Sequence, residues 1–393
     1  MAGPLDGIRV IDLTTIYSGP ICTSILGDQG ADVVKVESPT GDWIRGTLNV
    51  QRNGVSGSFA MMNRNKRSIV IDLTKNAGKD VLNRLIESAD IVVENFRPGT
   101  LEKWNLGPDR LHGVNPALVI CRITGYGQTG PYKDRPGFAR IAHAVSGLSH
   151  LAGMPDGPPV TPGSSSLADY FSGMNGALGI LMALRVAEQT GKGQVIDVAL
   201  YETIFRILDE TTTAYAWNGT VRGREGRMTR QVAPHGHFEC GDGKWVALAC
   251  TSDRMWDRLA RNVLGRDDLA DSHPRTADRL ADRAMIDQVV ETYTKSLPMV
   301  EVVQQCTDGD VPCGPINSIE DIFNDPHFAA RDTIETYDHP KLGPLKIPGT
   351  FPRLSKTPGQ VNSLGPELGD WNDKLETLLA DDSEIRHAPN KDN

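Results

Sequence analysis

The sequence predicts an α/β protein with a mostly parallel sheet, followed by a smaller module that mixes strands and helices. Short strand-like runs alternate with helical segments along the first 217 residues. Regular alternation of this kind implies parallel strands joined by helices that cover both faces of the sheet. The pattern then changes at a polar, arginine-rich stretch, beyond which a hairpin is expected around Gly241, Asp242 and Gly243.

Six runs rich in Val and Ile are the expected strands, and they lie within residues 8–13, 31–37, 63–73, 91–94, 118–123 and 194–199. Between and after them, helical segments are expected up to about residue 26 and within residues 76–88, 164–184 and 200–217. Gly27 and Gly30 mark the end of the first helix. The opening strand-helix-strand unit has no G-x-G-x-x-G motif, which argues against hydride transfer with a dinucleotide.

The chain divides into four expected segments. Residues 1–217 form a large domain, 218–231 a linker and 232–323 a small domain, while 324–393 form an irregular, proline-rich segment with a short helix. The linker carries four arginines, Arg222, Arg224, Arg227 and Arg230. Two interpretations of the linker stay open: a solvated hinge, or a basic lid over an anionic substrate.

Composition argues against several classes of protein. A net charge of −9 argues against a general nucleic-acid binder, which needs an excess of clustered Lys and Arg. The chain has no long apolar run, and its start lacks the regions of a signal peptide, so we expect a cytoplasmic protein without membrane partners. Six cysteines without C-x-x-C spacing, and His235 and His237 without nearby acids, predict reduced thiols and no metal site.

One acid stands apart from the rest of the sequence. In residues 164–184, Asp169 is the only ionisable carboxylate, and glycines recur every three residues beside apolar ones. The pattern predicts a buried helix whose glycine face admits another backbone or a ligand. Two roles for Asp169 stay open. It caps the helix in an S-x-x-D box with Ser166, or it is a nucleophile or base that the helix dipole keeps ionised.

Two loops and a group of basic residues are candidates for ligand binding. ENFRPG, residues 94–99, follows an expected strand at the carboxyl edge of the sheet, where open α/β folds bind ligands. The loop TGYGQTGPY, residues 124–132, is rich in glycine and is a second candidate. Four basic residues could hold phosphates together, or each could be a solvated surface charge: Arg64, Lys66, Arg67 and Arg97.

A series of motifs runs along nearly the whole chain: PLDGIRVIDLT, GADVVKVE, NKRSIVIDL, ENFRPG, ITGYGQTGPY, the Asp169 helix with TGKGQVIDVAL, GDGKWVALA and VPCGPINSIEDIFNDP. The series resembles the family III coenzyme A transferases, which include formyl-CoA:oxalate and carnitine CoA-transferases and are related to α-methylacyl-CoA racemases. The resemblance implies a Rossmann-like large domain built from both ends of the chain, to which residues 324–393 return. It also implies a small domain inserted near residues 225 to 325 and a homodimer of two interlocked subunits.

The resemblance also implies the site and its chemistry. Asp169 falls on the family's nucleophile, which would form an aspartyl anhydride and then an aspartyl-CoA thioester. Coenzyme A or acyl-CoA would bind as a substrate, with no permanently bound cofactor. The expected coenzyme A contacts are Ile16, Tyr17 and Ser18 near the thiol arm, Ile71, Asn95, Phe96 and Arg97 at the nucleotide end, and Lys103 and Trp104.

Two departures from the family pattern narrow the expected reaction. Tyr17 stands where formyl-CoA transferases carry Gln, and the linker is rich in arginine instead of glycine, which disfavours oxalate. Phe138 stands where racemases carry a catalytic His, and His143 or His150 would have to replace that base. We therefore expect a CoA-transferase whose acceptor is a dicarboxylate if Arg140 or the linker pairs with a second carboxylate. A 2-methylacyl-CoA racemase and a non-catalytic CoA-ester-binding subunit stay open as alternatives.

Overall fold

The computed structural model describes residues 3–47, 51–164 and 166–380 of the chain. The chain forms two compact units, and each is described by itself. The first unit combines Met1–Leu148, Thr161–Thr220 and Ala330–Asn393, and the second combines Ser149–Val160 and Val221–Ala329. The four-segment division expected from the sequence stays a prediction, and its last part, residues 381–393, lies outside the described residues.

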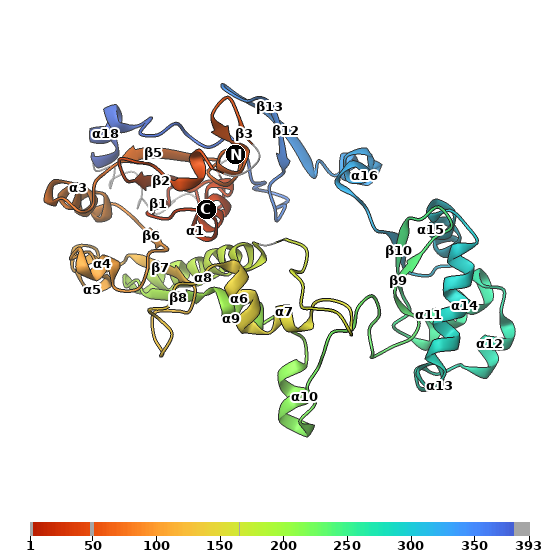
Figure 1. The fold of residues 1–393 in the computed structure, drawn as a ribbon. Coiled ribbons are helices and arrows are strands. Elements are labelled where there is room, and N and C mark those ends of the chain that lie inside the picture. Colours follow the sequence, from red (N-terminus) through yellow and green to blue (C-terminus); the bar gives the residue numbers. More distant parts are fainter. Residues whose placement is uncertain (1–2, 48–50, 165, 381–393) are drawn as a thin grey trace. The chain divides into compact units, whose positions relative to one another are not determined.

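The first unit is built on a six-stranded sheet, which Figure 1 shows in red to green. All five strand pairings are parallel, and the spatial order is β5-β2-β1-β6-β7-β8. Each strand lies within or overlaps a predicted one: β1 (Arg9–Asp12), β2 (Asp32–Glu37), β5 (Lys66–Val70), β6 (Ile91–Glu94), β7 (Val119–Thr124) and β8 (Val195–Ala199). The predicted α/β fold with a parallel sheet is therefore confirmed. The order of the strands reverses between β1 and β6, which lie side by side.

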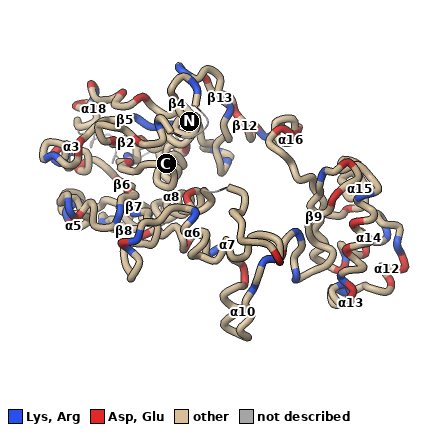
Figure 2. The backbone as a smooth tube through the Cα atoms, viewed as in Figure 1, with Lys and Arg blue, Asp and Glu red and all other residues tan. Residues whose placement is uncertain are grey.

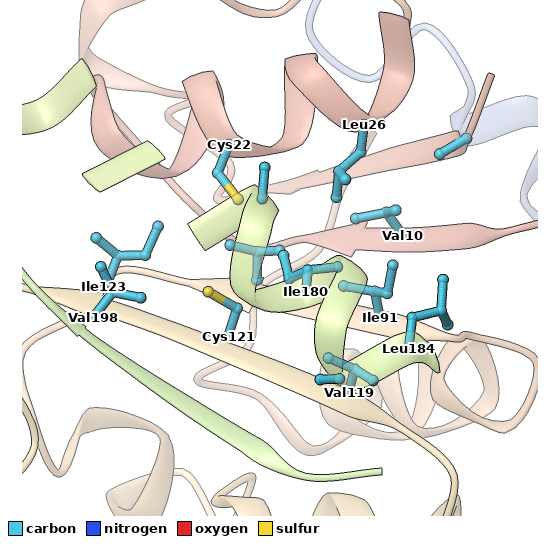
Figure 3. Close-up of a cluster of buried hydrophobic side chains, with 14 of the residues drawn as sticks. Val10, Cys22, Leu26, Ile91, Val119, Cys121, Ile123, Ile180, Leu184 and Val198 are labelled. Carbon is cyan, nitrogen blue, oxygen red and sulfur yellow. The ribbon is translucent and has the colours of Figure 1, made fainter. Parts of the chain in front are cut away.

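Both faces of the inner strands are buried, because successive strand residues belong to different cores. Val10 of β1 packs into the core under α1 (Ser18–Asp28) and α8 (Leu167–Thr190), whereas Ile11 packs into the core under α3 (Asn76–Glu87) and α5 (Pro108–Val114). Burying one such side chain contributes about 1.5–3 kcal/mol. Figure 3 shows the first core, with these side chains labelled: Val10, Cys22, Leu26, Ile91, Val119, Cys121, Ile123, Ile180, Leu184 and Val198.

The glycines of α8 allow α1 to approach closely, as the sequence predicts. A Cβ atom added at Gly173 would lie 2.7 Å from Ile21 Cγ2 and 2.8 Å from the Ser18 carbonyl oxygen. One added at Gly176 would lie 3.1 Å from Cys22 Sγ. Each glycine lowers helix propensity by roughly 1 kcal/mol relative to Ala. Close packing between the two helices is the physical reason that α8 carries them.

Two predictions about secondary structure are wrong. The helix expected at 200–217 is split into α9 (Leu200–Phe205) and α10 (Thr211–Asn218), and Asp209 between them has a left-handed φ of +51°. The segment expected to be irregular contains a hairpin of β12 (Ile334–His339) and β13 (Gly343–Pro348). Prolines within β13 hid this hairpin, since proline is tolerated only where a strand lies at an edge.

Shorter elements complete the first unit. Ser56 caps α2 by accepting a hydrogen bond from Phe59 N, and Asp42 caps the short helix η1 in the same way through Ile44 N. The elements are η1 (Trp43–Arg45), β3 (Gln51–Arg52), β4 (Val55–Ser56), α2 (Gly57–Met62), α4 (Thr100–Lys103), α6 (Ala139–Ser146), α7 (Leu148–Leu151, which reaches into the second unit), η3 (Asn372–Lys374) and α18 (Leu375–Leu379). The predicted short C-terminal helix corresponds to α18.

The second unit begins with the predicted hairpin, β9 (His235–Glu239) and β10 (Trp245–Ala249), to which β11 (Cys313–Pro315) adds a third strand. Figure 2 shows acidic and basic residues interspersed over its helices. These are α11 (Asp253–Arg258), η2 (Leu259–Val263), α12 (Asp267–Ser272), α13 (Thr276–Ala281), α14 (Arg283–Lys295), α15 (Met299–Asp308), α16 (Ile319–Asn324) and α17 (Pro326–Ala330, whose last residue belongs to the first unit).

The arginine-rich segment is bound within the second unit. Arg222 pairs with Glu225 at 3.1 Å, Arg227 pairs with Glu291 at 3.2 Å, and Arg224 donates to the His150 carbonyl at 3.2 Å. Three of the four arginines are half-buried, and only Arg230 is exposed. Two of the four arginines thus have acidic partners within the second unit, and the two interpretations of this segment both stay open.

Candidate active site

A cavity lies at the carboxyl edge of the sheet, where the strand order reverses between β1 and β6. Ligands of open α/β sheets bind at such a point, because the loops from the two strands diverge there. The cavity encloses about 190 Å³ between the loops that follow β1, β6 and β7. It brings together eight of the residues proposed from the sequence: Ile16, Tyr17, Ser18, Asn95, Phe96, Arg97, Phe138 and Asp169.

A second cavity of about 180 Å³ adjoins the first, since Thr15 and Phe96 line both. Ile71 and Trp104 line this second cavity. Phe96 and Trp104 meet edge to face, with ring centroids 5.3 Å apart. Asn95, Phe96 and Arg97, which the resemblance places at the nucleotide end, thus share the first cavity with the residues expected near the thiol arm. The assignment of both groups to coenzyme A stays a prediction.

Two residues proposed from the sequence lie outside both cavities, and two cations were missed. Lys103 and Arg140 are exposed and line neither cavity. Lys133 and Arg135 line the first cavity instead. They follow directly after the glycine-rich loop at 124–132, so extending that loop by three residues was the available signal.

The cavity therefore contains one carboxylate and three cations. Among the described residues that line it, Asp169 is the only acid, and Arg97, Lys133 and Arg135 are the basic residues. Arg135 stacks on the ring of Tyr132, 3.6 Å from its centroid. Within the described part of the chain, neither Arg97 nor Lys133 forms an ion pair. These cations form a positively charged surface that can bind anions, although the protein as a whole carries a net charge of −9.

Asp169 does not cap its helix. The Ser166 N–H donates to Ser164 Oγ at 3.2 Å, and Ser166 makes no side-chain capping bond. The Ala168 N–H, also in the first turn, donates to His143 Nε2 at 3.1 Å and not to the Asp169 carboxylate. The capping-box interpretation is therefore wrong, and the carboxylate is left facing the cavity.

Burial raises the pKa of Asp169 from 3.8 to about 7. The sequence analysis expects the helix N-terminus to favour the ionised carboxyl, whereas burial acts in the opposite direction and raises its pKa. Near neutral pH the group is therefore divided between its acid and its carboxylate forms. A carboxylate with a raised pKa is also more basic, which suits a nucleophile or a base.

Three of the four basic residues proposed to hold phosphates have structural partners. Lys66 Nζ lies 2.9 Å from Asp12 Oδ2, and both side chains are fully buried. Burial lowers the pKa of Lys66 to about 8. Arg64 and Arg67 pair with Asp28 and Asp32. The proposed group of four is therefore wrong, and Arg97 alone among them faces the cavity.

The loop between β1 and α1 is held by side chains from neighbouring strands. Asn95 accepts from the Thr15 N–H at 3.0 Å and donates to the Thr15 carbonyl at 2.8 Å. The Asn95 amide thus holds the cavity wall in addition to lining it. Ile16, the next residue, has a left-handed φ of +70°. A β-branched residue in this region is a true outlier, and such strain costs roughly 1–3 kcal/mol.

The cavity offers little for a two-base reaction. No histidine lines it among the described residues, and Phe138 stands where a proton-transferring group would be needed. His143 is buried, and its Nε2 atom already accepts the Ala168 N–H. Burial, with the Arg140 charge, lowers the pKa of His143. His150 belongs to the second unit.

The described residues include no group of three or more His, Cys, Asp or Glu side chains arranged to hold a metal ion. Over the same residues, no helix is long and apolar enough to cross a membrane. All six cysteines are free, and five of them are buried.

A parallel α/β sheet with a cavity at its switch point is typical of enzymes that bind their ligands there, and comparison with known proteins identifies the family. The chain matches the model of CoA-transferase family III over residues 5–372 and belongs to this family. It is 48% identical over 377 residues to the succinyl-CoA–L-malate CoA-transferase beta subunit of Chloroflexus aurantiacus, covering 95% of this chain and 93% of that one. It is 47% identical to the alpha subunit, covering 93% of this chain and 86% of that one.

A solved structure shares the same fold. The CAIB/BAIF family protein from Brucella suis superposes with a TM-score of 0.84 at 33% identity, covering 96% of this chain and all of that one. The expected resemblance to family III is thus confirmed. The protein is a CoA-transferase, and coenzyme A thioesters are its substrates.

Proposed function

We propose that Asp169 is the nucleophile that relays coenzyme A between two carboxylic acids. The Asp169 carboxylate attacks the thioester carbonyl of the donor, and the C–S bond breaks to give a mixed anhydride and the CoA thiolate. The thiolate then attacks the aspartyl carbonyl, releasing the donor acid and leaving an aspartyl-CoA thioester. The acceptor carboxylate repeats these steps in reverse. The observation that carries this proposal is the position of Asp169 as the one acid on the cavity wall.

The raised pKa of Asp169 supports this role. Because burial raises the pKa of the carboxyl to about 7, the ionised form is a stronger nucleophile than an ordinary aspartate. Burial also limits the access of water to the anhydride and the thioester, which hydrolysis would otherwise destroy. Ala168 is fully buried beside Asp169, and Phe171 is half-buried.

Coenzyme A would lie along the two adjoining cavities. The thiol arm would pass Ile16, Tyr17 and Ser18 next to Asp169, and the nucleotide would extend toward Ile71 and Trp104. Arg97 and Lys133 carry charges without acidic partners among the described residues, so they can bind the phosphates. Lys103 and Arg140, which line neither cavity, are weaker candidates for contacts.

The proposed acceptor is a small dicarboxylic acid. The Chloroflexus relatives are named for succinyl-CoA and L-malate, whose acids carry two carboxylates. One carboxylate would reach Asp169, and the second would pair with a cation of the same cavity. Arg135 lines this cavity, whereas Arg140 does not. We therefore assign the second carboxylate to Arg135 in preference to Arg140.

The outer face of α8 supports a second subunit. The inner face packs on α1 and β7, yet the outer face leaves large apolar side chains exposed: Met174, Leu178, Leu181, Met182 and Val186. Leu178 is 51% and Met182 is 61% exposed. A helix that is apolar on both sides is normally buried on both. We propose that a second copy of the chain covers this face, in the interlocked homodimer expected of a cytoplasmic, Rossmann-like family member.

The relatives that carry alpha and beta labels bear on this assembly. The chain is 48% identical to the beta subunit and 47% identical to the alpha subunit. A chain that resembled one subunit much more strongly would be expected to need the other. Because the identity to the two subunits is nearly equal, we infer that one chain takes both subunit positions in a homodimer.

The decisive experiment is the replacement of Asp169. Asp169→Ala should reduce CoA exchange between succinyl-CoA and malate by several orders of magnitude while leaving CoA binding intact. In the wild type, hydroxylamine should trap an aspartyl adduct that mass spectrometry locates at residue 169. Asp109→Asn, which changes an exposed first-turn acid of α5, is the matched control and should exchange CoA normally. Normal exchange by Asp169→Ala would overturn the mechanism.

The same preparation separates the two alternatives. A 2-methylacyl-CoA racemase would exchange the α-proton of its substrate with deuterium oxide in the absence of any acceptor acid. A non-catalytic subunit would bind CoA tightly and exchange it only when a second protein is added. The proposed transferase requires neither behaviour, because it acts alone on an acyl-CoA and a free acid.

A further inference from the structure

The backbone of Ile16 is unusual among the described residues. Seven non-glycine residues have a positive φ, and the six others are all Asn or Asp, which adopt this conformation most readily. Ile16 is the exception, with a φ of +70°. Its branched Cβ makes the left-handed conformation unfavourable, so other contacts must hold it. The residue also lines the cavity that contains Asp169.

A buried ion pair holds Ile16 in this conformation. The Ile16 N–H donates to both carboxylate oxygens of Asp42, at 3.1 and 3.2 Å. Lys35 Nζ lies 3.1 Å from Asp42 Oδ2 and donates to the Thr14 carbonyl at 2.8 Å. The side chains of Lys35 and Asp42 are both 0% exposed. The pair thus holds the loop at two points, one on each side of Thr15.

Asp42 is itself fixed by further bonds. Its backbone N–H donates to Glu37 Oε1 at 2.9 Å, and its carboxylate accepts from the Ile44 N–H at 3.3 Å. The side chain of Ile16 packs with Ile44 and its neighbours in a small apolar cluster. A carboxylate with so many partners cannot rotate away from Ile16, so the strained backbone has no easy relaxation.

The conformation of Ile16 sets the direction in which the chain enters α1. Tyr17 and Ser18 follow at once, and they line the cavity beside Asp169. The Ser18 carbonyl also lies against Gly173, one turn beyond Asp169 on α8. A relaxed Ile16 would move these residues relative to the nucleophile.

We propose that the Lys35–Asp42 pair is a positioning device for the transferase reaction, which holds Ile16 in its left-handed conformation so that the loop at 16–18 fits the acyl-CoA. Lys35 and Asp42 act through the loop and do not touch the reacting atoms. The proposal rests on the assignment of this cavity to acyl-CoA. A displacement on the ångström scale at such a site reduces catalysis by up to about 100-fold.

The test measures KM and kcat for the acyl-CoA donor in Asp42→Asn, which keeps the shape of the side chain but removes its charge. The KM should rise about tenfold, because the loop that binds the donor is misplaced. Adding Ile16→Gly should recover most of the lost affinity for the donor, since glycine adopts a positive φ without the hydrogen bonds to Asp42. Adding Ile16→Val should recover none, because valine keeps the branched Cβ. Asp28→Asn is the matched control at the other end of α1, where a buried acid pairs with Arg64, and its KM should not change.

Binding of CoA by calorimetry on the same variants keeps this test separate from the proposed mechanism. If Asp169→Ala proved active, the Asp42 variants should still bind CoA more weakly, with the same rescue by glycine. If Asp42→Asn fails to fold while the double variant with Ile16→Gly folds, the proposal is supported. An unchanged KM and CoA affinity in Asp42→Asn, equal rescue by glycine and valine, or no folded double variant would each overturn it.

Discussion

Replacing the proposed nucleophile should make the protein more stable, and the gain should depend on pH. Burial raises the pKa of Asp169 from its ordinary 3.8 to about 7. In the unfolded chain this carboxyl ionises at its ordinary pKa, whereas in the folded protein it stays protonated until the pH approaches 7. As the pH rises from 3.8 to about 7, the folded wild type therefore loses stability relative to the unfolded chain. Above a pH of about 7 the full cost of ionising the buried carboxyl is present. Asp169→Asn has a similar shape, cannot ionise and escapes this penalty.

The size of the effect follows from the pKa. One pKa unit corresponds to about 1.4 kcal/mol, so the rise from 3.8 to about 7 sets an upper bound of about 4 kcal/mol. The side chain borders a cavity and is only half-buried, and solvent there reduces the penalty. We therefore expect Asp169→Asn to be about 2 kcal/mol more stable than the wild type at pH 8, and about equal to it at pH 4.

Urea unfolding of both proteins at several pH values measures this difference. Asp72→Asn is a control of opposite sign. Hydrogen bonds from Thr74 lower the pKa of the half-buried Asp72 carboxyl, so removing its charge should decrease stability at neutral pH. A stability difference between wild type and Asp169→Asn that stays constant from pH 4 to pH 8 would refute the argument from burial. So would a loss of stability at pH 8.

Three further predictions test other parts of the structure. The value of kcat/KM for the acyl-CoA donor should rise through a pH of about 7 and then level off, because only ionised Asp169 attacks; a profile that is flat from pH 6 to 8 would contradict this. Gly173→Ala should destabilise the protein by about 1–3 kcal/mol, because the added methyl group would contact α1. Gly113→Ala in α5 has open space around it and should stabilise the protein by up to about 1 kcal/mol. Thermal unfolding that ranks the two variants in the opposite order would refute the packing argument. Leu178→Glu on the outer face of α8 should shift the assembly toward monomers in light scattering, and an unchanged mass would argue against a subunit interface there.

Much of the sheet could be predicted because each strand carries its own local signal. A run such as IRVIDL is apolar, β-branched and bounded by turn residues, so it identifies β1 without knowledge of its neighbours. The hairpin of β12 and β13 was not predicted, because its sequence lacks such a local signal. Its prolines at 344 and 348 are compatible with a strand only because this strand has one paired neighbour, which no local pattern reveals.

The candidate site was predicted in part. Asp169 could be singled out because a lone acid in an apolar, glycine-rich helix is a local feature, and most of the coenzyme A contacts came from the family resemblance. The sequence could not show which basic residues form internal ion pairs and which face the cavity. Lys66 pairs with Asp12 from 54 positions away, and Arg64 pairs with Asp28 from 36, whereas Lys133 and Arg97 face the cavity.

The sequence by itself determined the class of fold, the family and the identity of the one isolated acid, because those depend on residue order and local periodicity. Only the tertiary structure decided that Asp169 has a raised pKa, that Asn95 holds Thr15, and that Ile16 is kept in a left-handed conformation. The physical reason is that burial and hydrogen bonding depend on which distant segments meet. Desolvation of a carboxyl, or the strain in one backbone dihedral, exists only once the folded chain has assembled its surroundings.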